Sequence, residues 1–134
     1  MKYDAKKLIE AAIEARNNAY APYSKFKVGA AILLKNGQYI KGCNVENASY
    51  GLCNCAERTA LFTMICNGYN KNDVIAMAIV GDTKKPISPC GACRQVMIEL
   101  LDENCPIVLG NLNNDVKELV LKELLPYSFD DGDL

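Results

Sequence analysis

The chain of 134 residues contains no histidine and no tryptophan. Without histidine, nucleophile pairs that use an imidazole base and zinc sites with imidazole ligands are excluded. The 15 basic and 16 acidic residues nearly cancel, which argues against an electrostatic nucleic-acid binder or a polybasic membrane anchor. No apolar run approaches the roughly 20 residues that span a bilayer, and the amino terminus lacks a signal-peptide core. We therefore expect a cytoplasmic protein without nucleic-acid or membrane partners.

Cysteine, by contrast, is abundant, with seven residues in a short chain. In a reducing compartment this number favours metal binding or catalysis over a disulfide framework. Because histidine is absent, any metal ion must be held by sulfur, oxygen or both. The length suits one domain with a core of its own, so residues 1–134 are expected to form a single domain.

Apolar spacing and turn residues predict alternating strands and helices. Strands are expected over 28–34, through Tyr39 and Ile40 after an Asn36-Gly37 turn, over 74–81 and over 106–109. Helices are expected over 4–19, with Asp4 as cap, and over 88–101, with Ser88 as cap and Pro89 as the first residue. A third helix is expected over 55–67, with Leu61, Phe62 and Ile65 facing inward and Gly68 as its stop. Residues 116–125 fit either a strand followed by a short helix or a helix throughout. The alternation predicts a layered α/β domain with its sheet between helices.

The first cysteine pair is Cys90-Gly-Ala-Cys93, at the start of a predicted helix. Residues three apart on a helix share a face, so both sulfurs can reach one zinc ion at about 2.3 Å. The helix N-terminus also stabilises the thiolate that binds zinc. A redox pair is the alternative interpretation, but it leaves the second cysteine cluster unexplained.

The second cluster is CNCAERTA, residues 53–60. In a structural interpretation, the four thiols of Cys53, Cys55, Cys90 and Cys93 close a zinc site. In a catalytic interpretation, Cys55, Cys90 and Cys93 bind zinc and a water molecule takes the fourth position. Glu57 favours the catalytic interpretation, because an open site needs a base for the bound water. A capping box with Asn54 as N-cap is the alternative role of Glu57.

Glu57 and Arg58 follow the candidate ligand Cys55 directly. On a regular helix residues 55 and 57 lie about 200° apart, so they converge only if Cys55 sits in an irregular first turn. Three thiolates leave a zinc site with a net negative charge, which makes bound water a weaker acid. An Arg58 guanidinium bonded to the sulfurs would withdraw charge. Its alternative is an ordinary solvated side chain.

Cys-Ala-Glu followed at a distance by Pro-Cys-x-x-Cys is the cysteine form of the signature of zinc nucleobase deaminases, a class of known chemistry. The blocks APYSKFKVGAA, GCNVENASYGLCNCAERTALF, SPCGACRQVMIEL and ELLPYSF resemble, in order, those of the small homotetrameric zinc-dependent cytidine deaminases, within the cytidine and deoxycytidylate deaminase superfamily. The resemblance covers almost the whole chain. It implies a three-layer α/β/α sandwich around a mixed five-stranded sheet, one zinc ion per subunit, and active sites at the subunit interfaces of a homotetramer.

The resemblance also implies a reaction, the hydrolysis of cytidine or deoxycytidine to uridine or deoxyuridine and ammonia in pyrimidine salvage. Cys55, Cys90 and Cys93 would hold the zinc ion, and zinc-bound hydroxide would attack C4 of the pyrimidine. Glu57 would accept the proton of the water and pass protons to N3 and to the departing amine.

Several further positions match residues that bind substrate in this family. Asn44 and Glu46 would bind the ribose hydroxyls, and the carboxylate would repel a phosphate, which favours a nucleoside over a nucleotide. Phe26 would pack on the pyrimidine, and the backbone around Ala56, Ser88 and Cys90 would contact the base. Without the resemblance, Phe26 would be a buried core residue, and residues 44–46 would be a polar strand end or turn.

Two aromatic residues are expected to serve a neighbouring subunit. Phe129, in the polar tail FDDGDL, matches a residue that reaches the next active site in the family, and Tyr50 is expected at an inter-subunit site. Cys53 is expected to be a free, partly buried thiol, and Cys43, Cys66 and Cys105 to be small core residues.

Three rival functions remain open at this point. They are a deaminase of another aminopyrimidine such as a nucleoside antibiotic, a non-catalytic binding module with a four-cysteine zinc site, and a polynucleotide-editing deaminase. The last of these needs a basic groove or aromatic platforms for flanking nucleotides, and the near-neutral charge and lack of tryptophan argue against it.

Overall fold

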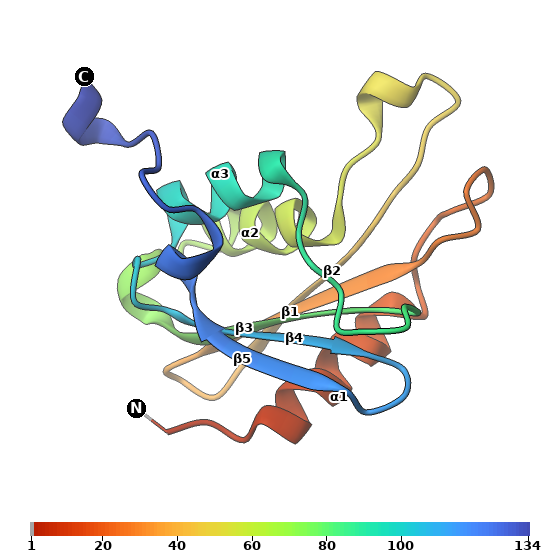
Figure 1. Cartoon of the computed structure of the whole chain (residues 1–134), viewed down its shortest axis with the longest axis horizontal. Coiled ribbons are helices and arrows are strands. Elements are labelled where there is room, and N and C mark those ends of the chain that lie inside the picture. The colour runs from red at the N-terminus through yellow and green to blue at the C-terminus, as the bar shows by residue number, and fades with distance from the viewer. Residues whose placement is uncertain (1) are drawn as a thin grey trace.

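Five strands form one sheet in the computed structural model, which describes residues 2–134 (Figure 1). The strands are β1 (Val28–Leu34), β2 (Tyr39–Cys43), β3 (Val74–Gly81), β4 (Pro106–Asn111) and β5 (Val116–Val120). Their order is β2-β1-β3-β4-β5, in which β3 and β4 run parallel and the other neighbours are antiparallel. The sheet is therefore mixed and five-stranded, as the resemblance implied.

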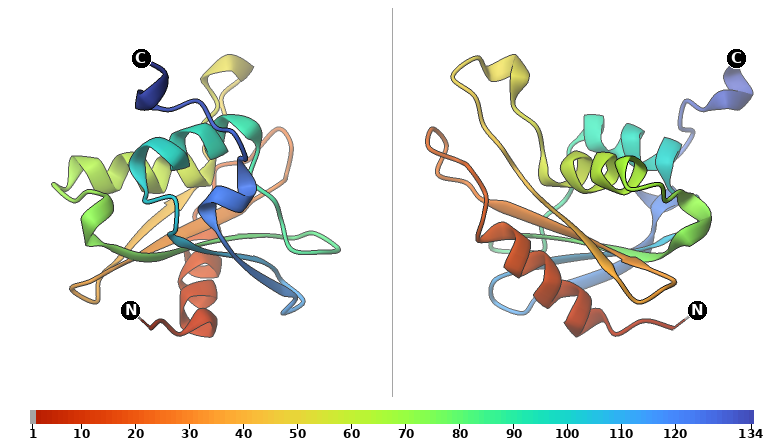
Figure 2. Two further views of the ribbon diagram at one scale, coloured as in Figure 1. Left: turned by 60° about the vertical axis from the view of Figure 1, so that its left-hand side comes forward. Right: turned by 180° about the vertical axis from the view of Figure 1, so that it is seen from behind.

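Helices cover both faces of the sheet, as Figures 1 and 2 show. Helix α1 (Ala5–Arg16) lies on one face, while α2 (Ala56–Cys66) and α3 (Gly91–Leu100) lie side by side on the other. Short 3₁₀ helices follow the loops and strands: η1 (Tyr50–Leu52), η2 (Lys71–Asp73), η3 (Leu121–Leu124) and η4 (Asp131–Asp133). The three-layer α/β/α prediction is confirmed. Within residues 2–134, no helix has the length and apolar composition needed to cross a membrane.

The alternation of side chains along the strands separates two core clusters. In β3, Ala76 and Ala78 belong to the cluster under α1, whereas Met77 and Ile79 belong to the cluster under α2 and α3. Successive residues of a strand point to opposite faces, so the small side chains lie under α1. The larger apolar side chains belong to the core cluster on the other face of the sheet, where α2 and α3 are packed. These two helices carry the cysteine clusters.

Most local signals of the sequence correspond to observed structure. Asp4 caps α1 by accepting hydrogen bonds from the amides of Lys6 and Lys7, a type of cap worth about 1 kcal/mol. The helix ends at Arg16, three residues earlier than predicted. Gly37 has a φ of 88°, as the predicted hairpin turn requires. Residues 116–125 form a strand and then a short helix, so the first of the two alternatives is correct.

Helix α2 ends where it was predicted to end. Gly68 has a φ of 88°, and its amide donates to the Ile65 carbonyl while the Tyr69 amide donates to the Met64 carbonyl. This pair of bonds is the Schellman motif that commonly ends a helix at glycine.

Three predictions about orientation are wrong. Phe62 and Ile65 are 48% and 45% exposed, because the inward stripe of α2 runs through Ala60, Leu61 and Met64 and these two residues lie beside it. Cys66, at the end of the same helix, is exposed rather than part of the core, while Cys105 is buried and Cys43 half-buried.

The start of α3 also differs from the prediction. Cys90 is the N-cap, with φ −69° and ψ 167°, and the first helical residue is Gly91. Ser88 and Pro89 therefore precede the helix instead of capping and opening it. The shift places a candidate zinc ligand at the helix N-terminus itself.

Gly42 of β2 allows α2 to approach the sheet closely. A Cβ atom at Gly42 would lie 2.6 Å from the carbonyl oxygen of Ala56 and would also collide with the backbone of Ala60. Only glycine fits such an approach of two backbones. The contact fixes the first turn of α2 against the sheet, and this turn follows Cys55.

Two segments project from the layers on the side of the sheet that carries α2 and α3 (Figures 1 and 2). One is the loop over residues 46–53, which contains η1, and the other is the tail over residues 125–134. Tyr50 in the loop is 76% exposed and Phe129 in the tail is 59% exposed. Both aromatic side chains therefore extend away from the core of their own chain.

Candidate zinc centre

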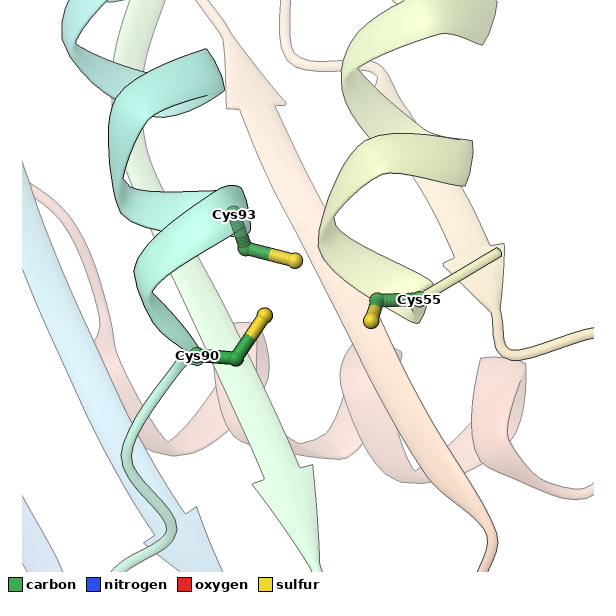
Figure 3. A group of neighbouring side chains, drawn as sticks. All are labelled: Cys55, Cys90 and Cys93. Atoms are coloured by element: carbon green, nitrogen blue, oxygen red, sulfur yellow. The ribbon is translucent and has the colours of Figure 1, made fainter. Parts of the chain in front are cut away.

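Three cysteines from two helix starts meet at one point (Figure 3). Cys55 is the N-cap of α2, Cys90 is the N-cap of α3, and Cys93 lies in the first turn of α3. Their sulfur atoms lie within 4.8 Å of one another and point toward a common centre. Sulfurs bound at about 2.3 Å to one tetrahedral zinc ion are less than about 4 Å apart, so the side chains need little movement to bind it.

Cys55 lies outside the regular rotation of helix α2, which is the condition under which Cys55 and Glu57 can converge. Its φ of −76° and ψ of 157° are extended, so Cys55 does not follow the helical rotation and can share a side with Glu57. Asn54 is not the N-cap, and its side-chain amide instead donates to the Thr59 hydroxyl over 3.1 Å. The capping-box interpretation of Glu57 is therefore wrong.

Glu57 is buried, with 4% of its surface exposed. Burial raises the pKa of its carboxyl, because the charged form loses hydration. Its own backbone amide lowers this pKa by hydrogen bonding, and the negative charge of Cys55 raises it. Burying a carboxyl group costs folding free energy unless the fold compensates it. The position of Glu57 beside the three thiols therefore indicates a chemical role.

The sulfurs and Arg58 are coupled electrostatically. A hydrogen bond with the Cys93 thiol, and after it the Arg58 guanidinium, lower the pKa of Cys55 to about 5. The same hydrogen bond between Cys55 and Cys93, together with burial, raises the pKa of Cys93. Arg58 Nη2 lies 3.4 Å from Cys55 Sγ, which agrees with the predicted contact rather than a solvated side chain. Thiolate is the form that binds zinc, so the lowered pKa of Cys55 favours its role as a ligand.

A cavity of about 200 Å³ adjoins the cysteine cluster. Its lining includes Cys55, Cys90 and Glu57, together with four positions predicted to bind substrate, Phe26, Asn44, Ala56 and Ser88. The Phe26 side chain is 42% exposed, so its alternative role as a core residue is wrong. The single chain thus brings the cluster, the buried carboxyl and an aromatic wall to one opening.

Asn44 stabilises the wall of this cavity. Its side-chain oxygen accepts a hydrogen bond from the Val28 amide, and its side-chain nitrogen donates to the Phe26 carbonyl, both over 2.8 Å. These bonds hold the segment that presents the Phe26 ring. Asn44 therefore lies at the cavity and also orders the residues around it.

Glu46 and Tyr50 line a different cavity, of about 320 Å³, with Tyr23, Ser24 and Cys53. The Glu46 carboxylate accepts hydrogen bonds from the Ser24 hydroxyl and from the amides of Ser24 and Tyr23. The bonds from Ser24 lower the pKa of Glu46, so this carboxylate is ionised near neutral pH.

Phe129 lines neither cavity. Its carbonyl accepts a hydrogen bond from the Gln95 side chain over 2.8 Å, while its ring is largely exposed. The structure of one chain therefore does not bring Phe129 or Tyr50 to the cysteine cluster.

Cys53 does not belong to the cluster. Its sulfur lies 3.3 Å from the Asn47 amide nitrogen, in the projecting loop, and it is half-buried as predicted. The four-cysteine interpretation is therefore not supported.

Arg94 is a residue of the site that the sequence reasoning missed. Its guanidinium bonds to Ser88, Pro89 and Leu124. The available signal was its place four residues after Cys90, in the first turns of the same helix. The contact with Leu124, thirty residues away, had no signal in the sequence.

Comparison with known proteins agrees with this geometry. The family described as the cytidine and deoxycytidylate deaminase zinc-binding region matches residues 2–109. A cytidine deaminase of Halalkalibacterium halodurans is 55% identical over 131 residues, which cover 98% of each chain. The crystal structure of a cytidine deaminase from Burkholderia pseudomallei superposes with a TM-score of 0.92 at 56% identity, covering 95% of this chain and 100% of that one. A more distant relative, a blasticidin-S deaminase of Bacillus cereus, is 30% identical and covers 91% of this chain and 89% of its own.

The chain belongs to the cytidine and deoxycytidylate deaminase family. Membership of a zinc-binding family and a cluster of three thiols that can hold one ion agree with the cofactor predicted from the sequence. The family and the fold that the resemblance implied are both confirmed.

Proposed function

We propose that this protein is a zinc-dependent cytidine deaminase. It hydrolyses cytidine and deoxycytidine to uridine and deoxyuridine with release of ammonia, a step of pyrimidine salvage. The observation that carries the proposal is the buried Glu57 carboxyl beside three converging thiols, at a cavity walled by Phe26. Two cytidine deaminases that are similar to the chain match it along nearly its whole length.

In this proposal Cys55, Cys90 and Cys93 hold one zinc ion per subunit. When bound, zinc supplies a water molecule of lowered pKa, and hence a nucleophile, at neutral pH. Arg58 withdraws negative charge from the ligands through its contact with Cys55 Sγ. This partly offsets the charge of three thiolates, which would otherwise weaken the acidity of the water.

Glu57 moves the protons of the reaction. Its carboxylate accepts a proton from the water, and the pKa raised by burial makes it a better base than an exposed glutamate. The same carboxyl then delivers this proton to N3 of the pyrimidine, takes up the remaining proton from the hydroxyl formed at C4, and passes it to the amine, which leaves C4 as ammonia. Burial also keeps bulk water away from the carboxyl, which limits proton exchange with solvent.

Substrate selection rests on the cavity wall and the neighbouring loop. Phe26 packs on the face of the pyrimidine, and the backbone at Ala56 and Ser88 contacts the base. Asn44 donates a hydrogen bond from its side-chain amide, and Glu46 accepts one with its carboxylate, at the ribose hydroxyls. An ionised Glu46 accepts well from a hydroxyl but repels a phosphate, so the substrate is a nucleoside rather than a nucleotide.

The functional unit is a homotetramer in this proposal, with active sites shared between subunits. The support is the exposure of Tyr50 and Phe129 on projecting segments, together with the exposed Phe62 and Ile65 of α2. Exposed apolar side chains that gather on one side of a domain mark contact surfaces. The three ligand thiols must remain reduced, which suits the cytoplasm.

One assay tests the proposal directly. Purified protein with measured zinc content is offered cytidine, deoxycytidine, cytidine monophosphate and blasticidin S, and ammonia release is followed for each. Turnover of the two nucleosides that is lost on chelation and restored by zinc is expected. Faster turnover of the nucleotide or of blasticidin S would refute the substrate, and turnover that is indifferent to chelation would refute the zinc chemistry.

A further inference from the structure

The guanidinium of Arg94 is a junction of three hydrogen bonds. Nε donates to the Pro89 carbonyl over 2.8 Å, Nη2 to the Ser88 hydroxyl over 2.5 Å, and Nη1 to the Leu124 carbonyl over 2.7 Å. The side chain thereby joins α3, the segment that leads into α3, and the end of η3. A planar guanidinium holds such partners in a fixed relative geometry, which a single ammonium group does not.

Two of the groups that Arg94 holds flank Cys90. The Arg94 backbone amide donates a hydrogen bond to the Cys90 carbonyl over 3.0 Å. The Arg94 side chain donates another to the carbonyl of Pro89, the residue before Cys90. The peptide units on both sides of Cys90 are thus bound by one residue. The direction of the Cα–Cβ bond of Cys90, from which its sulfur extends, follows from the orientation of these two peptide units.

Cys90 needs such support more than the other two candidate ligands. Cys93 is fully buried, and Cys55 is half-buried with Arg58 against its sulfur. Cys90 is exposed, so burial does not restrict its side chain. Within residues 2–134, the helical hydrogen bond of Cys90 is the one that its carbonyl accepts from the Arg94 amide, as expected for an N-cap residue.

We propose that Arg94 is a positioning residue that holds Cys90 toward the other two thiols. Through Ser88, which lines the same cavity, it also sets the wall that faces the base. Through Leu124 it anchors this segment to the chain after β5, so the ligand is braced from outside its own helix. The effect on substrate rests on the proposed function, whereas the effect on zinc does not.

Arg94→Ala and Arg94→Lys test the proposal, with Gln95→Ala as the matched control. Gln95 is adjacent on α3 and similarly half-buried, and it bonds the Phe129 carbonyl rather than the segment before Cys90. Zinc-loaded full-length proteins are mixed with a chromogenic chelator, and the rate of zinc release is recorded. The melting temperature of zinc-loaded and zinc-free protein and the kcat and KM for cytidine are measured in parallel.

For Arg94→Ala we expect zinc release faster by on the order of tenfold, since loss of a residue that orients a ligand costs about 10- to 100-fold in metal affinity. Arg94→Lys should also release zinc faster, because lysine cannot reach three partners. KM for cytidine should rise in both, through the displacement of Ser88. Gln95→Ala should release zinc at the wild-type rate, and millimolar guanidinium should slow release from Arg94→Ala.

A purely structural role of Arg94 predicts a different pattern. It would lower the melting temperatures of zinc-loaded and zinc-free protein equally and leave the release rate unchanged, and that result would overturn the proposal. If Arg94→Ala did not fold, the release rate of Arg94→Lys would decide in the same way. Faster zinc release without any cytidine turnover by the wild type would refute the proposed function alone, and wild-type protein that binds no zinc would refute both.

Discussion

The starts of α2 and α3 and the two projecting segments contribute to the site in opposite ways. At the helix starts, three thiols, Glu57 and Arg58 meet inside one chain, and each has a burial or hydrogen-bonding reason for its place. In the projecting segments, the side chains of Tyr50 and Phe129 are exposed and lie away from the cysteine cluster. The comparison teaches that the candidate metal centre and the cavity beside it are complete within one chain, whereas the two exposed aromatic residues would act only if the proposed neighbouring subunit is present.

Glu57→Gln should give the largest effect and would test the inner part of this comparison. The amide keeps the shape of the side chain but cannot accept the proton of water, so kcat for cytidine should fall by about 100- to 10,000-fold. Zinc content should remain that of the wild type. Glu99→Gln, an exposed change on α3, is the control and should be fully active. Near-normal ammonia release by Glu57→Gln would remove Glu57 from the mechanism.

Arg58→Gln should have the next largest effect. It leaves a hydrogen-bond donor near Cys55 Sγ but removes the positive charge, so we expect turnover to fall roughly 10- to 100-fold with zinc retained. Arg58→Lys keeps the charge and should lose less. Equal losses in both variants would show that the shape of the guanidinium, rather than its charge, matters at the sulfur.

Phe129→Ala addresses the projecting part of the comparison. Loss of an aromatic contact worth about 1 kcal/mol should lower kcat/KM for cytidine by up to about tenfold, without change in zinc content. The sharper measurement uses Phe129→Ala and Glu57→Gln chains expressed together. If Phe129 serves a neighbouring site, mixed assemblies contain sites with both residues intact, and activity should exceed that of separately prepared proteins mixed without exchange. Absence of this gain would mean that Phe129 serves its own chain or no site.

Cys53→Ser should have the smallest effect. Cys53 lies in the projecting loop, with its sulfur near the backbone of Asn47, and not with the three candidate ligands. Zinc stoichiometry measured by metal analysis should therefore stay at one ion per chain, and the melting temperature should change little. A loss of zinc in this variant would support the four-cysteine site. It would also show that the projecting loop takes part in metal binding, against the comparison drawn above.

Each half of the cysteine cluster was predictable from sequence because its information is local, and the family resemblance implied that the two halves share one ion. Cys90 and Cys93 are three apart at a helix start, and the Cys55-Ala-Glu57 segment places a ligand and a base in one turn. The sequence even supplied the condition for their convergence, an irregular first turn at Cys55, which the extended backbone there fulfils. Short continuous apolar runs and the Asn36-Gly37 turn likewise predicted the strands of the sheet, because the sequence of each strand carries its own signal.

The parts that were predicted incorrectly depend on contacts remote in sequence. Phe62 and Ile65 were expected inside because they are large and apolar, yet the stripe of α2 that faces the sheet runs through Ala60, Leu61 and Met64. Ser88 and Pro89 have the chemistry of a helix start, but α3 begins later. The side chain of Ser88 bonds instead to Arg94, a residue tied to the distant Leu124. Periodicity carries no information about such partners.

The close approach of α2 to Gly42 restricts how the gene for this protein can vary. Gly42 lies on β2, one of the two edge strands of the sheet, and would look replaceable to anyone who inspects only the candidate metal and substrate residues. Since any side chain there would press on Ala56 and Ala60, even alanine would displace the turn next to Cys55. We therefore expect random-mutagenesis libraries to tolerate changes at many exposed loop positions while rejecting every substitution at this strand residue.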